Sequence, residues 1–270
     1  MSTESTGRGE PDRTLHLLWR ERLGEPVGSR GPKQRASVDA VVDAAIAIAD
    51  EEGIEALSMR RIAERLGMKP MSVYTYVPGK AELIDLMWDR VLAELPTTYD
   101  SSAGWRPALR AWALDLWDFR LRHPWTLDVS GARGGLGPNE TQQQETSALL
   151  LDGLGLPGRD ILRCCWSVSR LVHGSARAMA ETRQATSATG VAENDWWLAR
   201  AGMFDEVAPD YAERFPFISA LGEQGTFEAL DEEGSYLEAE ARDTFEFSLE
   251  RLLDGIDVFI GRAPGQSTVE

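Results

Sequence analysis

Two short helical segments joined by a glycine constrain the fold of this chain more than any other part of its sequence. Residues 57–67 read LSMRRIAERLG and residues 68–76 read MKPMSVYTY, so Gly67 marks a tight turn between them. Ser58 is suited to cap the first segment, and Pro70 suits the first turn of the second, where its missing N–H would have no partner. The positions that would face inward are apolar: Ile62, Ala63, Leu66 and Val73. This spacing predicts a helix-turn-helix at about 57–76, whose first helix lies across the DNA backbone and whose second helix enters the major groove.

An ordinary pair of helices inside a bundle would show the same amphipathic pattern. The outward positions of this pair, however, are basic, hydroxylated and aromatic, as contact with phosphates requires. We therefore interpret the pair as a DNA-binding element.

Acidic residues dominate the chain as a whole but not this element. The formal net charge is −16, of which residues 1–95 carry −3 and residues 96–270 carry −13. Residues 56–81 are net +4, and residues 30–36 add three basic side chains and no acid. Small basic islands suit a local phosphate-binding patch, while an acidic body would weaken non-specific adhesion to DNA.

Helical patterning continues through the rest of the sequence. Apolar periodicity and residues that begin or end helices predict further helices at 37–52, 80–95, 105–123, 139–154, 157–183, 196–204, 211–221 and 245–260. No strand pattern or internal repeat competes, so the predicted fold is all-α. We expect a flexible arm at 1–32 (apart from a turn or two of helix at 15–22), a three-helix DNA-binding domain at 33–95, a larger helical domain at 96–262, and a tail at 263–270.

The sequence offers little to other classes of protein. It has no run of eighteen apolar residues, and its polar start lacks an apolar signal core, so we expect a cytoplasmic protein that does not enter a membrane. Cys164 and Cys165 are adjacent, which makes them poor disulfide partners and leaves no metal-ligand spacing. An enzyme is the weaker hypothesis, because the chain has three histidines, no GxSxG motif, and a glycine-rich segment at 131–137 that lacks a lysine. We expect no catalysis, no cofactor and no metal.

The motifs of residues 57–83 resemble the tetracycline-repressor (TetR) family. LSMRRIAERLG at 57–67, SVYTYV at 72–77 and KAEL at 80–83 are similar to that family's DNA-binding domain, and the resemblance covers about residues 33–95. A weaker likeness continues in YAERFP at 211–216 and in the final helix. The resemblance implies a homodimeric transcriptional regulator that binds a near-palindromic operator in double-stranded DNA. It also implies a repressor that a small apolar or drug-like effector releases from the operator.

The resemblance implies a set of DNA-contacting residues as well. Phosphates would be held, or flanked on the backbone, by Ser72, Tyr74, Tyr76 and Lys80. The remaining contact surface would comprise Met59, Arg60, Lys69, Pro70, Met71 and Thr75. Arg60 would bind a guanine edge with two hydrogen bonds, while Pro70 and Met71 would contact bases through apolar groups. The prototype has a proline in place of Met71 and an acid in place of Lys69, so a different operator is expected.

Basic residues also precede the first predicted helix of this domain. Arg30 and Lys33 lie in a segment that resembles the arm some family members lay in the minor groove. A solvated basic linker explains the same residues equally well.

Tryptophan is concentrated in the acidic part of the chain, where seven of the nine follow Pro96. Bulky aromatic residues at helical spacing are usually core, but a bundle rich in indoles with internal polar groups is also suited to hold an apolar ligand. We expect an effector pocket lined by Trp112, Phe119, Trp125, Trp166, Arg170 and His173. A solvated or interface stripe explains Arg170 equally well, and a satisfied buried histidine explains His173.

The final helix carries more large apolar residues than one buried stripe needs. The resemblance implies a four-helix dimer interface formed by the helices at 157–183 and 245–260 with their symmetry mates. We expect the partner-facing seam to consist of Phe245, Leu249, Leu252, Ile256 and Phe259, with Phe247 and Leu253 pointing elsewhere. A DNA-binding regulator without an effector remains the alternative, because a pocket and a core look alike in sequence.

Overall fold

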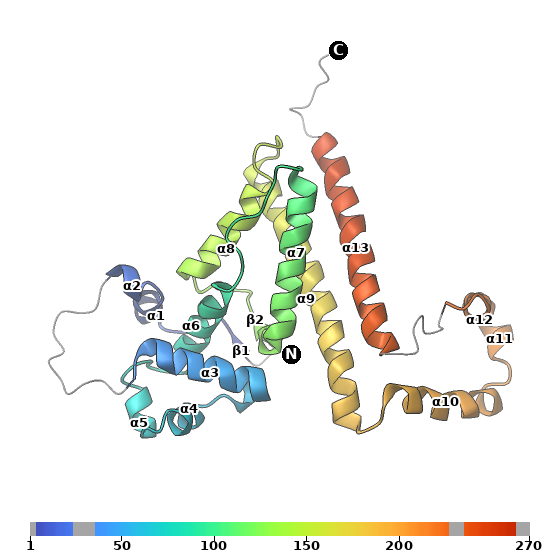
Figure 1. Ribbon diagram of the computed structural model, residues 1–270, viewed down its shortest axis with the longest axis horizontal. Coiled ribbons are helices and arrows are strands. Elements are labelled where there is room, and N and C mark those ends of the chain that lie inside the picture. Colours follow the sequence, from blue (N-terminus) through green and yellow to red (C-terminus); the bar gives the residue numbers. More distant parts are fainter. Residues whose placement is uncertain (1–3, 24–35, 227–234, 263–270) are drawn as a thin grey trace, which may run out of the picture. The chain divides into compact units, whose positions relative to one another are not determined.

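The computed structural model describes residues 4–23, 36–226 and 235–262, and the chain within these ranges is helical (Figure 1). They contain thirteen α-helices, two short 3-10 helices, and one pair of two-residue strands. The predicted all-α fold is confirmed. Arg30, Lys33 and the predicted tail at 263–270 lie outside the described residues. In the ranges described, no helix combines the length and the apolar character needed to cross a membrane.

The helix-turn-helix belongs to a small group of helices: α3 (Val38–Glu52), η1 (Ile54–Ala56), α4 (Met59–Arg65), α5 (Pro70–Val73) and α6 (Lys80–Leu92). Ser58 Oγ accepts a hydrogen bond from the Arg61 N–H at 3.3 Å, which caps the first turn of α4. Gly67 has a φ of +64°, a conformation that residues with a Cβ rarely adopt, and it makes the turn toward α5. The core beneath the pair is fully buried and apolar: Val41, Ala45, Ile62, Ala63, Val73, Val77, Leu83 and Met87.

Helix α6 contacts α1 (Pro11–Leu18), α3 and α8 (Pro138–Leu149), so it connects the helix-turn-helix with the helices that follow (Figure 1). Three acidic side chains of α6 are buried among these contacts: Glu82, Asp85 and Asp89. A buried carboxylate needs hydrogen-bond donors. The donors come from two segments far away in the sequence, one before α3 and one after α7 (Trp105–Arg122).

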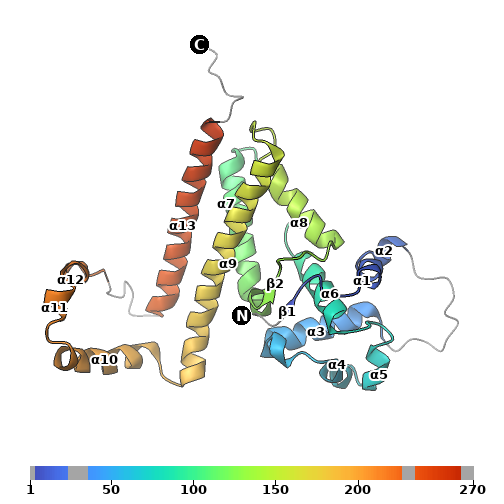
Figure 2. The same ribbon diagram turned by 180° about the vertical axis from the view of Figure 1, so that it is seen from behind.

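The first of these segments, residues 4–23, is ordered where a flexible arm was expected. Strand β1 (Glu4–Ser5) pairs in parallel with β2 (Val129–Ser130), and α1 and α2 (Arg20–Leu23) follow it (Figure 2). Helix α1 packs on α6 and buries Leu18. The prediction of a flexible arm is therefore wrong for residues 4–23, and the strand pair was not expected. We call residues 4–23 the N-terminal strap.

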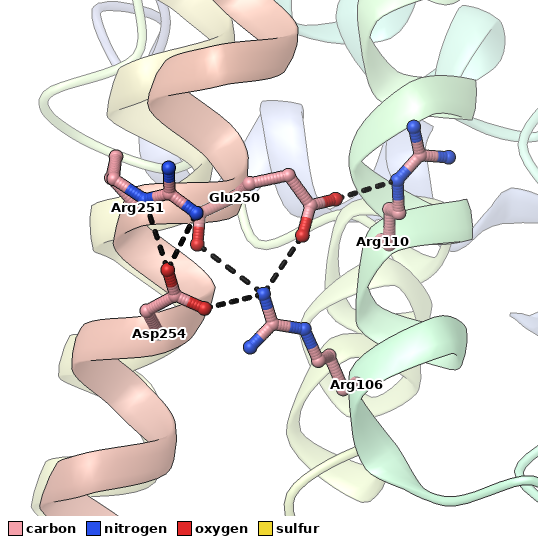
Figure 3. A network of polar contacts seen from close by, with 5 residues as sticks. All are labelled: Arg106, Arg110, Glu250, Arg251 and Asp254. Atoms are coloured by element: carbon pink, nitrogen blue, oxygen red, sulfur yellow. Dashed lines mark hydrogen bonds and ion pairs between the residues drawn. The ribbon is translucent and has the colours of Figure 1, made fainter.

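The helices that follow the DNA-binding group are α7, α8, α9 (Gly158–Thr189) and α13 (Tyr236–Gly261), with η2 (Pro124–Leu127) after α7. An ion network joins α7 to α13 (Figure 3). Arg106 Nη2 lies 2.8 Å from Glu250 Oε2 and 2.7 Å from Asp254 Oδ1, and Arg110 Nε donates to Glu250 Oε1 at 2.9 Å. Two arginines on one helix thus share the carboxylates of the other, which fixes the register between them.

Residues 177–247 form a second compact unit. It holds the end of α9, then α10 (Glu193–Val207), α11 (Tyr211–Arg214) and α12 (Pro216–Glu223), and the start of α13. Glu193 accepts hydrogen bonds from Ser235 Oγ and, at 3.0 Å, from the Leu237 N–H, which ties α10 to the first turn of α13. Helix α9 continues past its predicted end at 183, and α10 begins at Glu193, ahead of the helix predicted at 196–204.

Candidate DNA-binding site

The turn and helix α5 present the residues that were expected to read DNA. Lys69, Pro70, Met71, Tyr74 and Thr75 are exposed, and Met71 is the most open of the apolar side chains in this region, at 77%. Ser72 and Tyr76 are half-buried beside them. Buried Val73 and Val77 anchor the same short segment in the core. The structure therefore gathers seven of the predicted residues on one accessible element, and their contact with DNA stays a prediction.

Helix α4 places its two predicted contact residues differently. Arg60 is exposed, and its Nε donates to Glu64 Oε1 at 2.8 Å on the same helix. Met59 is 8% exposed and belongs to the core, so its expected position beside Arg60 on the DNA surface is wrong. Met59 is the first residue of α4 and is buried together with Ile62 and Ala63 of the same helix.

Carboxylates accompany the basic residues of this surface, which the sequence reading did not anticipate. Arg61 pairs with Glu52, and Arg65 Nη1 donates to Glu51 Oε2 at 2.7 Å. The hydrogen bond from Arg65 holds the pKa of Glu51 below its usual range. Exposed ion pairs of this kind cost little to break, about 0–1 kcal/mol, so a phosphate is able to replace these partners.

Lys80 begins α6 and is the expected phosphate ligand at that helix terminus. Its side chain is 34% exposed, and its Nζ lies 2.8 Å from Glu4 Oε1 of the N-terminal strap. The sequence contains no pattern that brings residue 4 to residue 80. Arg30 and Lys33, which were expected to form a basic arm, lie outside the described residues.

The acids of α6 receive donors from both neighbouring segments. Asp85 Oδ1 accepts a hydrogen bond from the Gly7 N–H at 2.7 Å, and Glu82 Oε1 accepts one from the Glu10 N–H at 3.1 Å. Asp89 Oδ1 accepts from the N–H groups of Asn139 and Glu140, each at 2.9 Å. Burial raises the pKa of Asp85, Asp89 and Glu140. Nowhere in the described residues do three or more His, Cys, Asp or Glu side chains form a group that could hold a metal ion.

The six residues expected to line an effector pocket fall into different environments. Trp112, Phe119 and Trp125 are buried, each at 5% exposure or less. Trp166 and Arg170 are exposed on α9, and His173 is half-buried. The expected lining is therefore not brought into one enclosed site within this chain, because the stripe of Trp166 and Arg170 faces outward. The indole N–H groups of Trp112 and Trp125 are buried without a hydrogen-bond partner among the described residues.

Arg120 of α7 is a buried cation that the sequence reading missed. Its side chain stacks over the ring of Trp88, with the guanidinium carbon 4.9 Å from the ring centroid, and Nη1 donates to Thr126 O at 3.1 Å. Its Nε is buried without a partner, and no carboxylate in the described ranges pairs with it. Burial lowers the pKa of Arg120 to about 10, which leaves the side chain charged at neutral pH. An arginine on the otherwise apolar stripe of α7 was the available signal.

The residues of the expected dimer seam on α13 differ in exposure: some are buried within the chain and others are accessible. Phe245, Leu249 and Ile256 are 4% exposed or less, so they belong to the interior of the chain and cannot face a partner. Leu252 is half-buried and Phe259 is exposed. Leu253, expected to point away from the partner, lies in the buried set. The buried stripe of α13 therefore includes Leu253 and Ile260, each one residue after the predicted seam positions Leu252 and Phe259.

Two parts of the sequence match known protein families. Residues 41–87 match the bacterial regulatory proteins of the tetR family, and residues 98–260 match the tetracyclin repressor-like C-terminal domain. The N-terminal strap precedes both matched regions.

Individual proteins are similar over most of the chain. The HTH-type transcriptional repressor DrrR1 of Streptomyces coeruleorubidus is 38% identical over 267 residues, which cover 98% of this chain and 93% of that protein. The tetracycline repressor protein class D of Escherichia coli is 29% identical over 57% of this chain and 70% of that protein. The crystal structure of ActR, a TetR family protein of Streptomyces coelicolor, in complex with actinorhodin aligns with a TM-score of 0.61 and 26% identity. The alignment covers 86% of this chain and 100% of that one.

Proposed function

This chain belongs to the tetR family of bacterial regulatory proteins, and from that premise we propose that it is a transcriptional repressor that a small-molecule effector releases from DNA. The proposal rests on the accessible surface of α5 above a fully buried helix-turn-helix core. A short helix that exposes a methionine and is flanked by exposed lysine, tyrosine and threonine side chains suits entry into the major groove. We place the repressor with its operator in the cytoplasm, and we assign it no catalytic step.

The buried polar groups around α7 support an effector site. An unpaired buried N–H costs about 1–3 kcal/mol, and an arginine without a carboxylate partner adds the cost of a buried charge. Trp112, Trp125 and Arg120 offer such groups. An effector with a flat aromatic body and a carbonyl or anionic oxygen would satisfy them. The ActR complex with actinorhodin indicates that proteins similar to this chain bind small molecules.

A homodimer would supply the symmetry of a near-palindromic operator. We assign the partner-facing surface to α9 and α13, where Trp166, Arg170, Val258 and Phe259 are exposed and Leu252 is half-buried. The second unit exposes further apolar side chains on α10 to α12: Trp197, Leu198, Met203, Phe204, Val207, Phe215, Phe217 and Ile218. Apolar groups in this number are unusual on a monomer and suit burial against a second copy.

Two substitutions distinguish backbone contacts from base contacts. Lys80→Ala should weaken binding to operator and random DNA alike and lower the magnitude of the slope of log K against log[salt] by roughly one.

Arg60→Ala should cost about 1–3 kcal/mol of binding free energy on the operator, with less loss on random DNA, because a guanine contact is lost. Fluorescence anisotropy on both DNAs, over a salt series, measures both effects. Equal losses on the two DNAs for Arg60→Ala would reassign that residue to the backbone.

The operator itself is obtained by selecting genomic fragments that the full-length protein retains. Effector candidates are then scored by release of the selected fragment and by thermal stabilisation of the protein, since a ligand that binds only the folded state raises stability by mass action. Arg120→Met should abolish release by an oxygen-bearing aromatic effector while leaving operator binding intact. Retention of no specific fragment would contradict the repressor proposal.

A further inference from the structure

We propose that the N-terminal strap lowers the affinity of this protein for DNA. Glu4 of the strap forms an ion pair with the ammonium group of Lys80, which a DNA phosphate would otherwise bind. The inference rests on the proposed DNA-binding function and deepens it, by assigning a regulatory residue to the same site. It concerns residues that precede both regions matched by family.

The contact between the two residues is direct. Lys80 Nζ lies 2.8 Å from Glu4 Oε1, and the two side chains are 34% and 21% exposed. Lys80 is the first residue of α6, where the helix terminus itself attracts an anion. A carboxylate placed there acts as a substitute for a DNA phosphate. It neutralises the lysine and repels an approaching phosphate.

Glu4 is not a side chain that swings freely at the end of the chain, because the residues around it are fixed. Glu4 and Ser5 pair with Val129 and Ser130 in the parallel strands. Thr6 is 1% exposed, and its N–H donates to Ser130 O at 3.0 Å. The Gly7 N–H then donates to Asp85 of α6. The backbone on either side of the strand is therefore held to the 129–130 strand and to the helix that begins at Lys80.

The rest of the strap adds anchors on both sides of α6. Trp19 Nε1 donates to Leu136 O at 2.9 Å, in the loop before α8. Arg20 pairs with Asp39 of α3. Leu18, the neighbour of Trp19 in the sequence, is buried. Because the strap contacts α3, α6 and the loop at 129–136, moving the backbone of Glu4 away from Lys80 requires the strand pair to open.

The test compares full-length variants by their affinity for the selected operator and for random DNA over a salt series. Glu4→Gln keeps the side-chain shape but removes its charge. We expect it to raise affinity for both DNAs by about two- to fivefold at low salt, the scale of an exposed ion pair. We expect the salt slope to keep its magnitude, since Lys80 meets a phosphate in both proteins and the variant removes only the cost of breaking the Glu4–Lys80 ion pair.

Three further variants separate the possible outcomes. Asp12→Asn removes a charge from an exposed position on the same strap and should change nothing. Gly7→Ala should raise affinity as Glu4→Gln does, because Gly7 has a φ of +68° and a Cβ there would meet Arg133 at 3.0 Å, which loosens the strap with Glu4 retained. On a Lys80→Ala background, Glu4→Gln should have a much smaller effect, because the ion pair that it breaks is gone and only the repulsion between Glu4 and a phosphate remains.

Different outcomes would overturn the role of the strap and the proposed DNA-binding function. If Lys80→Ala weakens DNA binding but Glu4→Gln does not strengthen it, the strap inference is overturned and the proposed function stands. An equal gain from Asp12→Asn would also overturn it, since net charge alone would then explain the effect. If Lys80→Ala changes neither affinity nor slope, the phosphate assignment of Lys80 is wrong and the strap has nothing to compete for. Absence of DNA binding by every variant would reject the proposed function itself.

Discussion

Asp85 is a buried carboxylate held by backbone N–H groups of the N-terminal strap. Its Oδ1 accepts the Gly7 N–H at 2.7 Å, the Gly9 N–H contributes a further backbone hydrogen bond, and Glu82 places a like charge nearby. Burial raises the pKa of Asp85, and the hydrogen bond from Gly7 opposes the rise. A group whose folded-state pKa exceeds its unfolded value adds stability below the unfolded value, and this stability is lost as pH rises through the folded value. At neutral pH the chain therefore carries the cost of a buried charge.

Replacing Asp85 with asparagine should remove that cost. The amide oxygen still accepts the Gly7 N–H, and no charge remains to be buried. We expect Asp85→Asn to match the wild type at about pH 4, near the unfolded pKa of aspartate, and to exceed its free energy of unfolding by about 1 kcal/mol at neutral pH. Urea denaturation of both proteins across this range measures the difference.

Replacing Asp85 with alanine, which has no hydrogen-bond acceptor, is the control for this prediction. Asp85→Ala removes the acceptor of the Gly7 N–H and should destabilise the protein at every pH, with a smaller salt-bridge population between Glu4 and Lys80. A difference between Asp85→Asn and wild type that shrinks as pH rises would reverse the sign argued above.

At the scale of elements, α6 supplies the N-terminal cap of α8. Asp89 Oδ1 accepts the N–H groups of Asn139 and Glu140, and Oδ2 accepts from Asn139 Nδ2 at 3.0 Å. An anion at a helix N-terminus is stabilised by the exposed N–H groups and the helix dipole. Gly137 makes the approach possible, since a Cβ at this position would lie 2.1 Å from Asp89 Oδ1. The α6–α8 junction thus depends on one carboxylate and one glycine.

Gly137→Ala should therefore displace Asp89 and lose the cap. We expect a loss of about 1–3 kcal/mol in the free energy of unfolding, the range for buried hydrogen bonds to a charged acceptor. Asp89→Ala should cost a similar amount, and the double variant no more than the worse single one, because both remove the same interaction. Gly135→Ala is the matched control in the same loop, where a Cβ would lie 3.5 Å from its nearest neighbour. Additive losses would show that Gly137 has a separate role.

Local sequence signals predicted the helix-turn-helix but not the elements that surround it. Ser58, Gly67 and Pro70 act within a few residues of their own positions, so capping and turn rules locate α4 and α5. Glu82, Asp85 and Asp89 are buried on α6, and no sequence pattern had singled them out. Their donors are backbone N–H groups 50 to 78 residues away, which no side-chain pattern encodes. The strap accordingly looked like a polar arm.

At the scale of the whole molecule, periodicity on α13 identified the apolar positions but not what covers them. Leu249 and Ile256 face the chain's own interior, and Phe259 is exposed. Two apolar stripes on one helix look alike in sequence. Only the rotation of the helix about its axis decides which stripe packs into the chain's own core and which is left to contact a second subunit. The ion network between α7 and α13 sets that rotation, and it too links residues 140 or more apart.

The exposed stripe leads to a test of the proposed dimer. Phe259→Glu, alone or with Leu252→Glu, should give a monomer at micromolar concentration with helical content unchanged, because a buried charge at a two-fold interface is costly. Phe247→Glu is the matched control, as it changes an apolar residue expected off the seam, and it should remain dimeric. Sedimentation velocity with circular dichroism distinguishes these states. A wild-type monomer, or a dimeric double variant that still binds the operator, would place the interface elsewhere.

The pairing of β1 with β2 also sets an order of events during synthesis. Thr6 leaves the ribosome early, but the Ser130 carbonyl that it bonds lies 124 residues later in the chain. At roughly 5–20 residues per second, synthesis of the intervening chain takes roughly 6–25 s. The complete helix-turn-helix, with Lys80, emerges well before β2 exists to receive the strand. A nascent chain therefore exposes its DNA-binding helices before Glu4 is fixed in place. Until the strand pair forms, the ammonium group of Lys80 is available to DNA without competition from Glu4.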